Sequence, residues 1–146
     1  MVEQRIPSIM REAFGALAKG DVEKSLSFFA DDATWVTSNG TFKGKAGLRR
    51  YLTWMAQTTK DMTIKECGIG IMVQGNKAFV EHMIGGTMEG KRGEVLAMCA
   101  WEFSGDKVQS MRTVMDRLSL AQQAAKGCPA RWLVNLIVRR AEKGLR

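Results

Sequence analysis

The segment FFADDATWVTSNGTFKG, residues 28–44, joins two adjacent carboxylates, an aromatic stretch and a glycine turn. Residues 34–38 are mostly β-branched or aromatic, which favours a short strand. The Asn39-Gly40 dipeptide is a strong two-residue hairpin signal, and residues 41–42 return as a partner strand. The segment therefore predicts a small hairpin that follows directly on a helix.

Amphipathic helices flank this hairpin on both sides. Apolar residues recur at i, i+3 and i+4 spacing over residues 6–19, which predicts a helix that buries one face and ends at Gly20. Asp21 is a good N-cap for a second helix over residues 22–29. A third helix is predicted over residues 45–56.

The second half of the chain changes from helical to strand periodicity. Four strand-length segments are predicted at residues 62–74, 77–88, 94–104 and 107–118. Short glycine-containing turns separate them, so we expect an antiparallel meander. Glycines inside the strand patterns predict bulges or bends at Gly68, Gly70, Gly85 and Gly86. The fold class is α+β: a cone-shaped, curved antiparallel sheet packed with N-terminal helices, enclosing an apolar pocket.

Composition excludes several classes of protein. The 146 residues fit one domain, with 45% hydrophobic and 25% charged residues, as in ordinary globular proteins. No apolar run approaches the ~20 residues of a membrane span, and the charged N-terminal stretch does not resemble a secretory signal. The three cysteines show no metal-binding spacing. We therefore expect reduced thiols and a cytoplasmic protein. No phosphate-binding loop or nucleophile elbow is present, and we expect no metal or cofactor.

The positive charge is concentrated at the C-terminus. Six basic residues and one acidic residue lie at positions 126–146, so five of the seven net positive charges fall there. Short helices are predicted from Arg117 to Lys126 and over residues 130–143. The last of these is basic and amphipathic. A solvated helix that packs on the cone or on a second subunit explains it best; nucleic-acid binding is not expected, and contact with a membrane surface is the weaker alternative.

The order of these pieces resembles the SnoaL-like family of the nuclear transport factor 2-like superfamily. The resemblance rests on the Phe-Phe-Ala-Asp-Asp segment, the aromatic strand, the Gly-X-Phe-X-Gly turn, the helix after it, and the meander ending in a carboxylate. It covers roughly residues 6–122, so we expect a cone domain over residues 1–122 and a basic amphipathic helix over residues 123–146. The family includes polyketide cyclases, ketosteroid isomerases, limonene epoxide hydrolases, small dehydratases and non-enzymatic binding domains.

The resemblance implies two catalytic residues. Asp116 matches the carboxylate at the end of the last strand, which acts as acid or base in cyclases and hydrolases of the superfamily. His82 stands where the hydrolases carry an arginine, and alternation places it on the same face as Ile84. A histidine and an aspartate in one apolar cavity would tune each other's pKa for general acid–base catalysis. The alternative is that His82 is a buried sheet histidine and Asp116 caps the next helix.

The remaining predicted site residues form the pocket wall. Trp35 and Thr37 share a face of the first strand and match positioning groups of the hydrolases, whereas Asp31 and Asp32 are expected to serve the helix-to-strand corner through Asx-type bonds. The other expected wall residues are Tyr51, Trp54, Ile84, Ala97, Cys99, Trp101 and Val114. The expected ligand is small and hydrophobic.

Residues 96, 98 and 100 are also apolar, so both faces of the sheet are expected to be covered. In the superfamily that the chain resembles, the outer sheet face is commonly buried by a second subunit, so the resemblance implies a homodimer. Two functions stay open. The first is a SnoaL-like lyase, isomerase or cyclase that acts on a small hydrophobic carbonyl compound. The second is a non-catalytic ligand-binding or dimerisation domain of the same fold.

Overall fold

The computed structural model describes residues 2–144 of the chain. The helices are α1 (Val2–Ala18), α2 (Val22–Ser27), α3 (Gly44–Thr58), α4 (Arg117–Ala124) and α5 (Gly127–Ala141). The strands are β1 (Phe29–Thr37), β2 (Gly40–Lys43), β3 (Lys60–Gln74), β4 (Lys77–Met88), β5 (Lys91–Ser104) and β6 (Lys107–Met115). The predicted α+β class and the order of its elements are confirmed.

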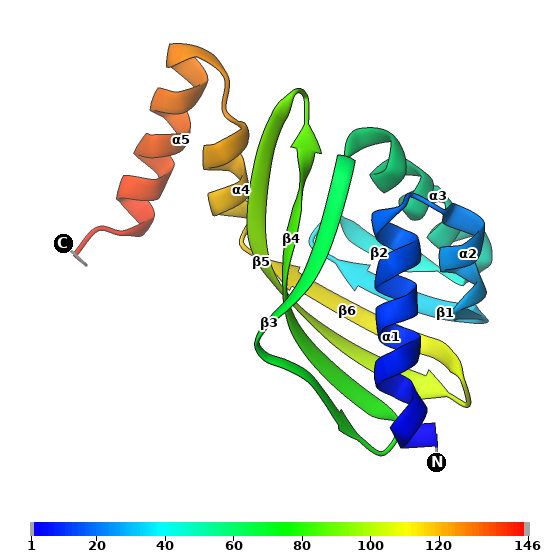
Figure 1. The fold of residues 1–146 in the computed structure, drawn as a ribbon. Helices are drawn as coiled ribbons and strands as arrows, with labels where there is room; N and C mark the ends of the chain where they lie inside the picture. The colour runs from blue at the N-terminus through cyan, green and yellow to red at the C-terminus, as the bar shows by residue number, and fades with distance from the viewer. Residues whose placement is uncertain (1, 145–146) are drawn as a thin grey trace.

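The strands form one mixed sheet in the order β2-β1-β6-β5-β4-β3. The predicted meander from β3 to β6 and the β1–β2 hairpin are antiparallel, but β1 pairs with β6 in parallel. As Figure 1 shows, α1, α2 and α3 lie on one side of the curved sheet, while α4 lies beside β5 and α5 lies beyond α4. The parallel pairing places the β1–β2 hairpin beside the end of the last strand.

Local sequence explains most element boundaries. The Asp21 carboxylate accepts a hydrogen bond from the Lys24 amide at 3.0 Å, so it caps α2 as predicted. The turn glycines Gly75 and Gly105 have φ angles of 61° and 59°, a region that favours glycine. The antiparallel strands can therefore reverse direction within two or three residues.

The predicted corner at Asp31 and Asp32 is wrong, because strand β1 already begins at Phe29. Both aspartates are exposed, and their carboxylates contact side chains of neighbouring elements. The Asp31 carboxylate lies 3.9 Å from the Lys45 amine, and Asp32 accepts a hydrogen bond from the Gln109 amide at 3.0 Å. Strand β1 pairs with β6 on either side of the two aspartates, at Phe29 with Val108 and at Thr34 with Ser110, and the register shifts between these pairs.

A bulge in β3 confirms the interpretation of Gly68 and Gly70. Both have positive φ angles, 54° and 64°, and the β3–β4 register shifts between Glu66 and Ile71. The Glu81 carboxylate occupies the place that a Cβ at Gly68 would take, 2.0 Å away, and accepts a hydrogen bond from the Ile69 amide at 3.2 Å. The positive φ of residue 68 therefore favours glycine, and the absence of a side chain lets the flexible Glu81 carboxylate reach the backbone of the bulge.

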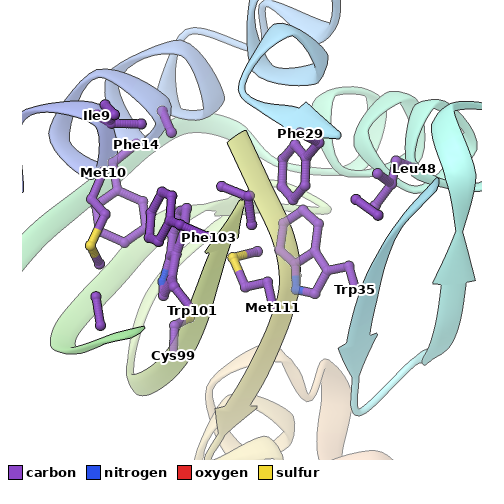
Figure 2. Close-up of a cluster of buried hydrophobic side chains, with 14 of the residues drawn as sticks. Ile9, Met10, Phe14, Phe29, Trp35, Leu48, Cys99, Trp101, Phe103 and Met111 are labelled. Atoms are coloured by element: carbon purple, nitrogen blue, oxygen red, sulfur yellow. The ribbon is translucent and has the colours of Figure 1, made fainter. Parts of the chain in front are cut away.

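The main core lies between α1, α3 and the inner face of the sheet. Figure 2 shows this cluster, in which Met10 and Phe14 of α1 meet Trp101 and Phe103 of β5. The Phe14 ring packs edge-on against the Trp101 ring, with centroids 5.5 Å apart. Helix α1 is therefore held against the sheet by aromatic packing, as the spacing of its apolar residues predicts.

Two apolar surfaces stay exposed in the single chain. On the outer face of the sheet, β5 contributes Leu96 and Met98, and β6 contributes Val114, which is 70% exposed. On α5, the exposed apolar side chains are those of Trp132, Leu133, Leu136 and Ile137. Among the described residues, no helix combines the length and the apolar character needed to cross a membrane.

Candidate ligand-binding cavity

A cavity of about 290 Å³ lies between α3, α4 and the adjoining ends of β3, β4 and β5. Its apolar lining comes from Tyr51, Trp54, Met55, Met62, Ile84, Met88, Val95, Met115, Leu120 and Ala124. Its small and polar lining comes from Ser38, Asn39, Thr59, Gly85, Gly86, Lys91, Arg92, Gly93, Arg117 and Gln123. The flexible thioethers of four methionines give the wall a shape that adapts to an irregular apolar ligand.

The charged groups that line the cavity are all cations. Lys91, Arg92 and Arg117 line it, whereas no carboxylate and no imidazole of the described residues does. Each cation donates to a backbone carbonyl: Lys91 to Ala125 at 2.6 Å, Arg92 to Asp61 at 3.3 Å and Arg117 to Ser38 at 3.0 Å. None of the three forms an ion pair within residues 2–144. The cavity is therefore apolar with a positively charged rim.

Helix α4 closes one side of the cavity through Gln123. The Gln123 amide accepts from the Glu94 backbone N–H at 2.9 Å and donates to the Glu94 carbonyl at 2.8 Å. These two bonds satisfy the backbone N–H and C=O of Glu94, which lies beyond the point where β5 stops pairing with β6, at Ala97. Gly93 makes the approach possible, because a Cβ there would lie 2.8 Å from the Gln123 side-chain oxygen.

Tyr51 supplies the phenol of the cavity wall. Its ring stacks on Phe42, with centroids 4.3 Å apart, and meets the Trp35 ring edge-on at 5.0 Å. Burial raises the pKa of the Tyr51 phenol, while interactions with the Thr37 and Asn39 side chains and the charge of Arg117 offset part of that rise. The phenol therefore stays protonated near neutral pH and can donate a hydrogen bond to a ligand.

His82 does not line the cavity. Its side chain is 1% exposed and packs under Phe14, with ring centroids 4.9 Å apart. Burial lowers the pKa of His82, and the Val80 backbone offsets part of this, but Nδ1 has no partner with hydrogen-bonding geometry among the described residues. The imidazole is therefore held neutral inside the core.

A buried polar chain connects His82 to the first strand. The Trp35 indole donates to the Thr113 hydroxyl at 2.9 Å, and Thr113 Oγ1 lies 3.1 Å from Cys99 Sγ. Cys99 Sγ in turn lies 3.9 Å from His82 Nε2. Burial raises the pKa of the Cys99 thiol to about 12, so the sulfur keeps its proton and can donate it toward the imidazole. These groups pair with one another and do not face the cavity.

Asp116 caps helix α4. Its carboxylate accepts a hydrogen bond from the Ser119 amide at 3.0 Å, and its side chain is exposed. The expectation that Asp116 and His82 share one cavity is corrected here, because the chain leaves the strand ladder at Met115 and turns Asp116 into a cap. The placement matches the alternative interpretation, in which His82 is a buried sheet histidine and Asp116 caps the next helix. A catalytic role for either residue stays a prediction.

The predicted wall residues fall into four groups. Tyr51, Trp54 and Ile84 line the cavity. Four others are buried on the inner sheet face without lining it: Trp35, Ala97, Cys99 and Trp101. Val114 points to the outer face, because Met111, Thr113 and Met115 take the inward positions of β6. Thr37 contacts the hairpin instead, where its hydroxyl accepts from the Asn39 amide at 3.0 Å.

Sequence reasoning missed the basic rim and the α4 wall. Lys91 and Arg92 stand in a predicted turn, and Arg117 at a predicted strand end, where cations are ordinarily solvated. The available signal was their position at the end of the sheet where the hairpin, the β4–β5 turn and the helix after β6 converge. No group of three or more potential metal ligands occurs among residues 2–144.

A curved sheet with helices on its concave side and an apolar cavity at one end defines the nuclear transport factor 2-like class of folds. Residues 10–111 match the family model described as "SnoaL-like domain". The chain belongs to this SnoaL-like family.

Solved structures agree with this fold. A protein from Catenulispora acidiphila with a ketosteroid isomerase-like fold, in complex with trimethylamine, is 19% identical, with a TM-score of 0.76 over 86% of this chain and 97% of that one. An LEH-like epoxide hydrolase from M. tuberculosis is 15% identical, with a TM-score of 0.72 over 93% and 97% of the two chains. An NTF2-like protein from Burkholderia xenovorans is 25% identical, with a TM-score of 0.66 over 83% and 96%. No match was found among curated protein sequences.

Proposed function

We propose that this SnoaL-like protein binds a small hydrophobic molecule in the cavity between α3, α4 and the sheet. The observation that carries the proposal is the cavity itself: about 290 Å³, largely apolar, with a few convergent polar groups. The rim cations are pre-positioned by backbone carbonyls, and the wall carries one phenol that stays protonated. Together these features support ligand binding and do not depend on a catalytic reaction.

A second candidate is a SnoaL-like lyase, isomerase or cyclase that acts on a hydrophobic carbonyl compound. One observation favours it: Asp116 lies between Met115 and Arg117, both of which line the cavity. A rotation of the carboxylate away from Ser119 would bring an acid–base group to the cavity edge. His82 would contribute only indirectly, because it is buried in the core.

We expect the neutral fluorescent probe N-phenyl-1-naphthylamine to bind in the cavity, and Ile84→Trp to weaken its binding by at least about tenfold. The indole would fill space that the probe needs. Leu120→Trp, on the opposite wall, is a second blocking variant in case the first disturbs the sheet. A fluorescence titration gives the Kd, and thermal melting verifies that each variant is folded.

The matched control is Asp116→Asn, which retains the helix cap and lies outside the lining. It should bind the probe within about twofold of the parent. Unchanged probe affinity in both folded blocking variants would contradict binding in this cavity. Loss of turnover in Asp116→Asn, with probe binding intact, would favour the enzymatic candidate.

We also propose that the chain forms a homodimer through the outer face of the sheet. Met98 and Val114 are neighbours across β5 and β6 and are 41% and 70% exposed, with Leu96 beside them on the same face. Exposed apolar residues that are contiguous on a flat sheet face are typical of subunit interfaces.

Met98→Glu is expected to convert a dimer to a monomer at micromolar concentration in sedimentation velocity, because a two-fold interface buries two copies of the new charge. Leu133→Glu, on the exposed face of α5, is the control and should leave the dimer intact. A monomeric parent protein, or dissociation by Leu133→Glu alone, would contradict an interface on the outer sheet face.

A further inference from the structure

The cavity carries a charge pattern that the hydrophobic-ligand proposal does not use. Its lining holds three cations and no carboxylate, although the chain contains fifteen acidic residues. Ion pairs occur elsewhere among the described residues, as between Arg11 and Glu66 at 2.7 Å and between Arg49 and Glu23 at 2.9 Å. The rim cations lack such partners among the described residues, so their charge is available to a ligand.

Arg117 is the best placed of the three. One of its guanidinium nitrogens donates to the Ser38 carbonyl at the β1–β2 turn, which fixes the side chain at the cavity edge. A guanidinium has five N–H donors, so the bond to Ser38 leaves others for a ligand. Tyr51 also lines the cavity, and its phenol interacts with Asn39, the neighbour of Ser38, and with the Arg117 charge.

These two side chains offer complementary contacts to one anionic oxygen group. Arg117 provides a permanent positive charge with a planar set of donors that suits a carboxylate. Tyr51 provides a neutral O–H donor, held in place by stacking on Phe42 and Trp54 with centroids 4.3 and 5.9 Å apart. Lys91 and Arg92, at the start of β5, add positive potential without an opposing acid in the lining.

We propose that the ligand of this cavity is an amphipathic organic anion, whose apolar frame occupies the methionine-lined space and whose carboxylate or comparable oxyanion is bound by Arg117 and Tyr51. This inference rests on the proposed binding function and adds the charge of the ligand to it. A neutral or cationic ligand of the same shape binds less tightly, because it leaves the rim cations without a partner.

The experiment compares two probes of the same frame, 1-naphthaleneacetate and its neutral amide, 1-naphthaleneacetamide. Each displaces N-phenyl-1-naphthylamine from the protein in a fluorescence competition assay. A charge-assisted contact predicts that the carboxylate competes at about a tenfold lower concentration than the amide. Added salt should narrow this ratio, because it screens the rim charges.

Arg117→Gln should reduce the preference for the carboxylate to within about twofold while leaving the amide's affinity within about twofold of the parent value. Arg50→Gln removes the same charge from an exposed position on the same helix as Tyr51 but outside the lining, so it should keep the full preference. Tyr51→Phe retains the ring and should lower the carboxylate's affinity selectively.

Equal competition by 1-naphthaleneacetate and 1-naphthaleneacetamide in the parent protein would overturn the inference. A preference for the carboxylate over the amide that survives Arg117→Gln would overturn it as well. These outcomes differ from failure of the binding function itself. In that case, Ile84→Trp and Leu120→Trp would leave probe binding unchanged, and neither naphthalene compound would displace a cavity-bound probe.

Discussion

Replacing Phe14 with alanine lowers the free energy of unfolding by about 3–5 kcal/mol, the range typical of large-to-small changes at buried aromatic positions. Phe14 is 8% exposed, and its ring packs against both His82 and Trp101, with centroids 4.9 and 5.5 Å apart. Its removal leaves a cavity between α1 and the sheet, and the two rings beneath it lose their packing contacts. Urea or thermal unfolding followed by circular dichroism measures the change.

The control for this prediction is Phe14→Leu. Leucine refills most of the volume but loses the ring contacts, so the expected loss is smaller, about 1–2 kcal/mol. A loss below about 1 kcal/mol for Phe14→Ala would show that α1 is not packed on the sheet as described.

Lowering the pH from 7 destabilises the protein through His82, its single histidine. Burial lowers the pKa of His82 below its ordinary value of 6.5. At a pH between the two pKa values, His82 is therefore protonated in the unfolded chain and neutral in the folded chain. The stability that neutral His82 contributes is fully present above about pH 6.5, the pKa in the unfolded chain. It is lost as the pH falls from there to the lower pKa of His82 in the folded protein. Within that window the free energy of unfolding falls by up to about 1.4 kcal/mol per pH unit.

The comparison with His82→Gln isolates this effect, because glutamine does not titrate and the carboxylates are common to both proteins. Unfolding free energies measured by urea titration between pH 7 and pH 5 should converge as the pH falls, since the histidine protein loses stability faster. Parallel curves for the two proteins would contradict a buried, neutral His82. A steeper loss in His82→Gln would reverse the sign and contradict it as well.

Neutral His82 also bears on the predicted chemistry. The side chain contacts Phe14 and, through Cys99, the Thr113–Trp35 pair, which places it in the core rather than at a site. Sequence alternation correctly placed His82 on the inner face with Val80 and Ile84. Alternation alone does not say whether an inner position faces a cavity or a packed helix, and α1 covers this one.

The site was predictable to the extent that its residues follow local rules. Tyr51 was identified on the apolar side of an amphipathic helix, Trp54 as an aromatic residue of the same helix, and Ile84 because it alternates along a strand. Arg117 and Gln123 could not be identified in this way. Their position depends on where β6 ends and where α4 docks on β5, and Gln123 reaches β5 across 29 positions of sequence.

The sequence by itself determined the order and type of the helices and strands, the β1–β2 hairpin and the antiparallel meander. These follow from side-chain periodicity, helix caps and turn residues, all of which act between neighbours in the chain. Only the tertiary structure decided that β1 pairs in parallel with β6, that Asp116 becomes a helix cap, and that three unpaired cations surround one apolar cavity. Those outcomes depend on contacts between distant segments, whose free energy is set by the packing of the whole domain rather than by any local pattern.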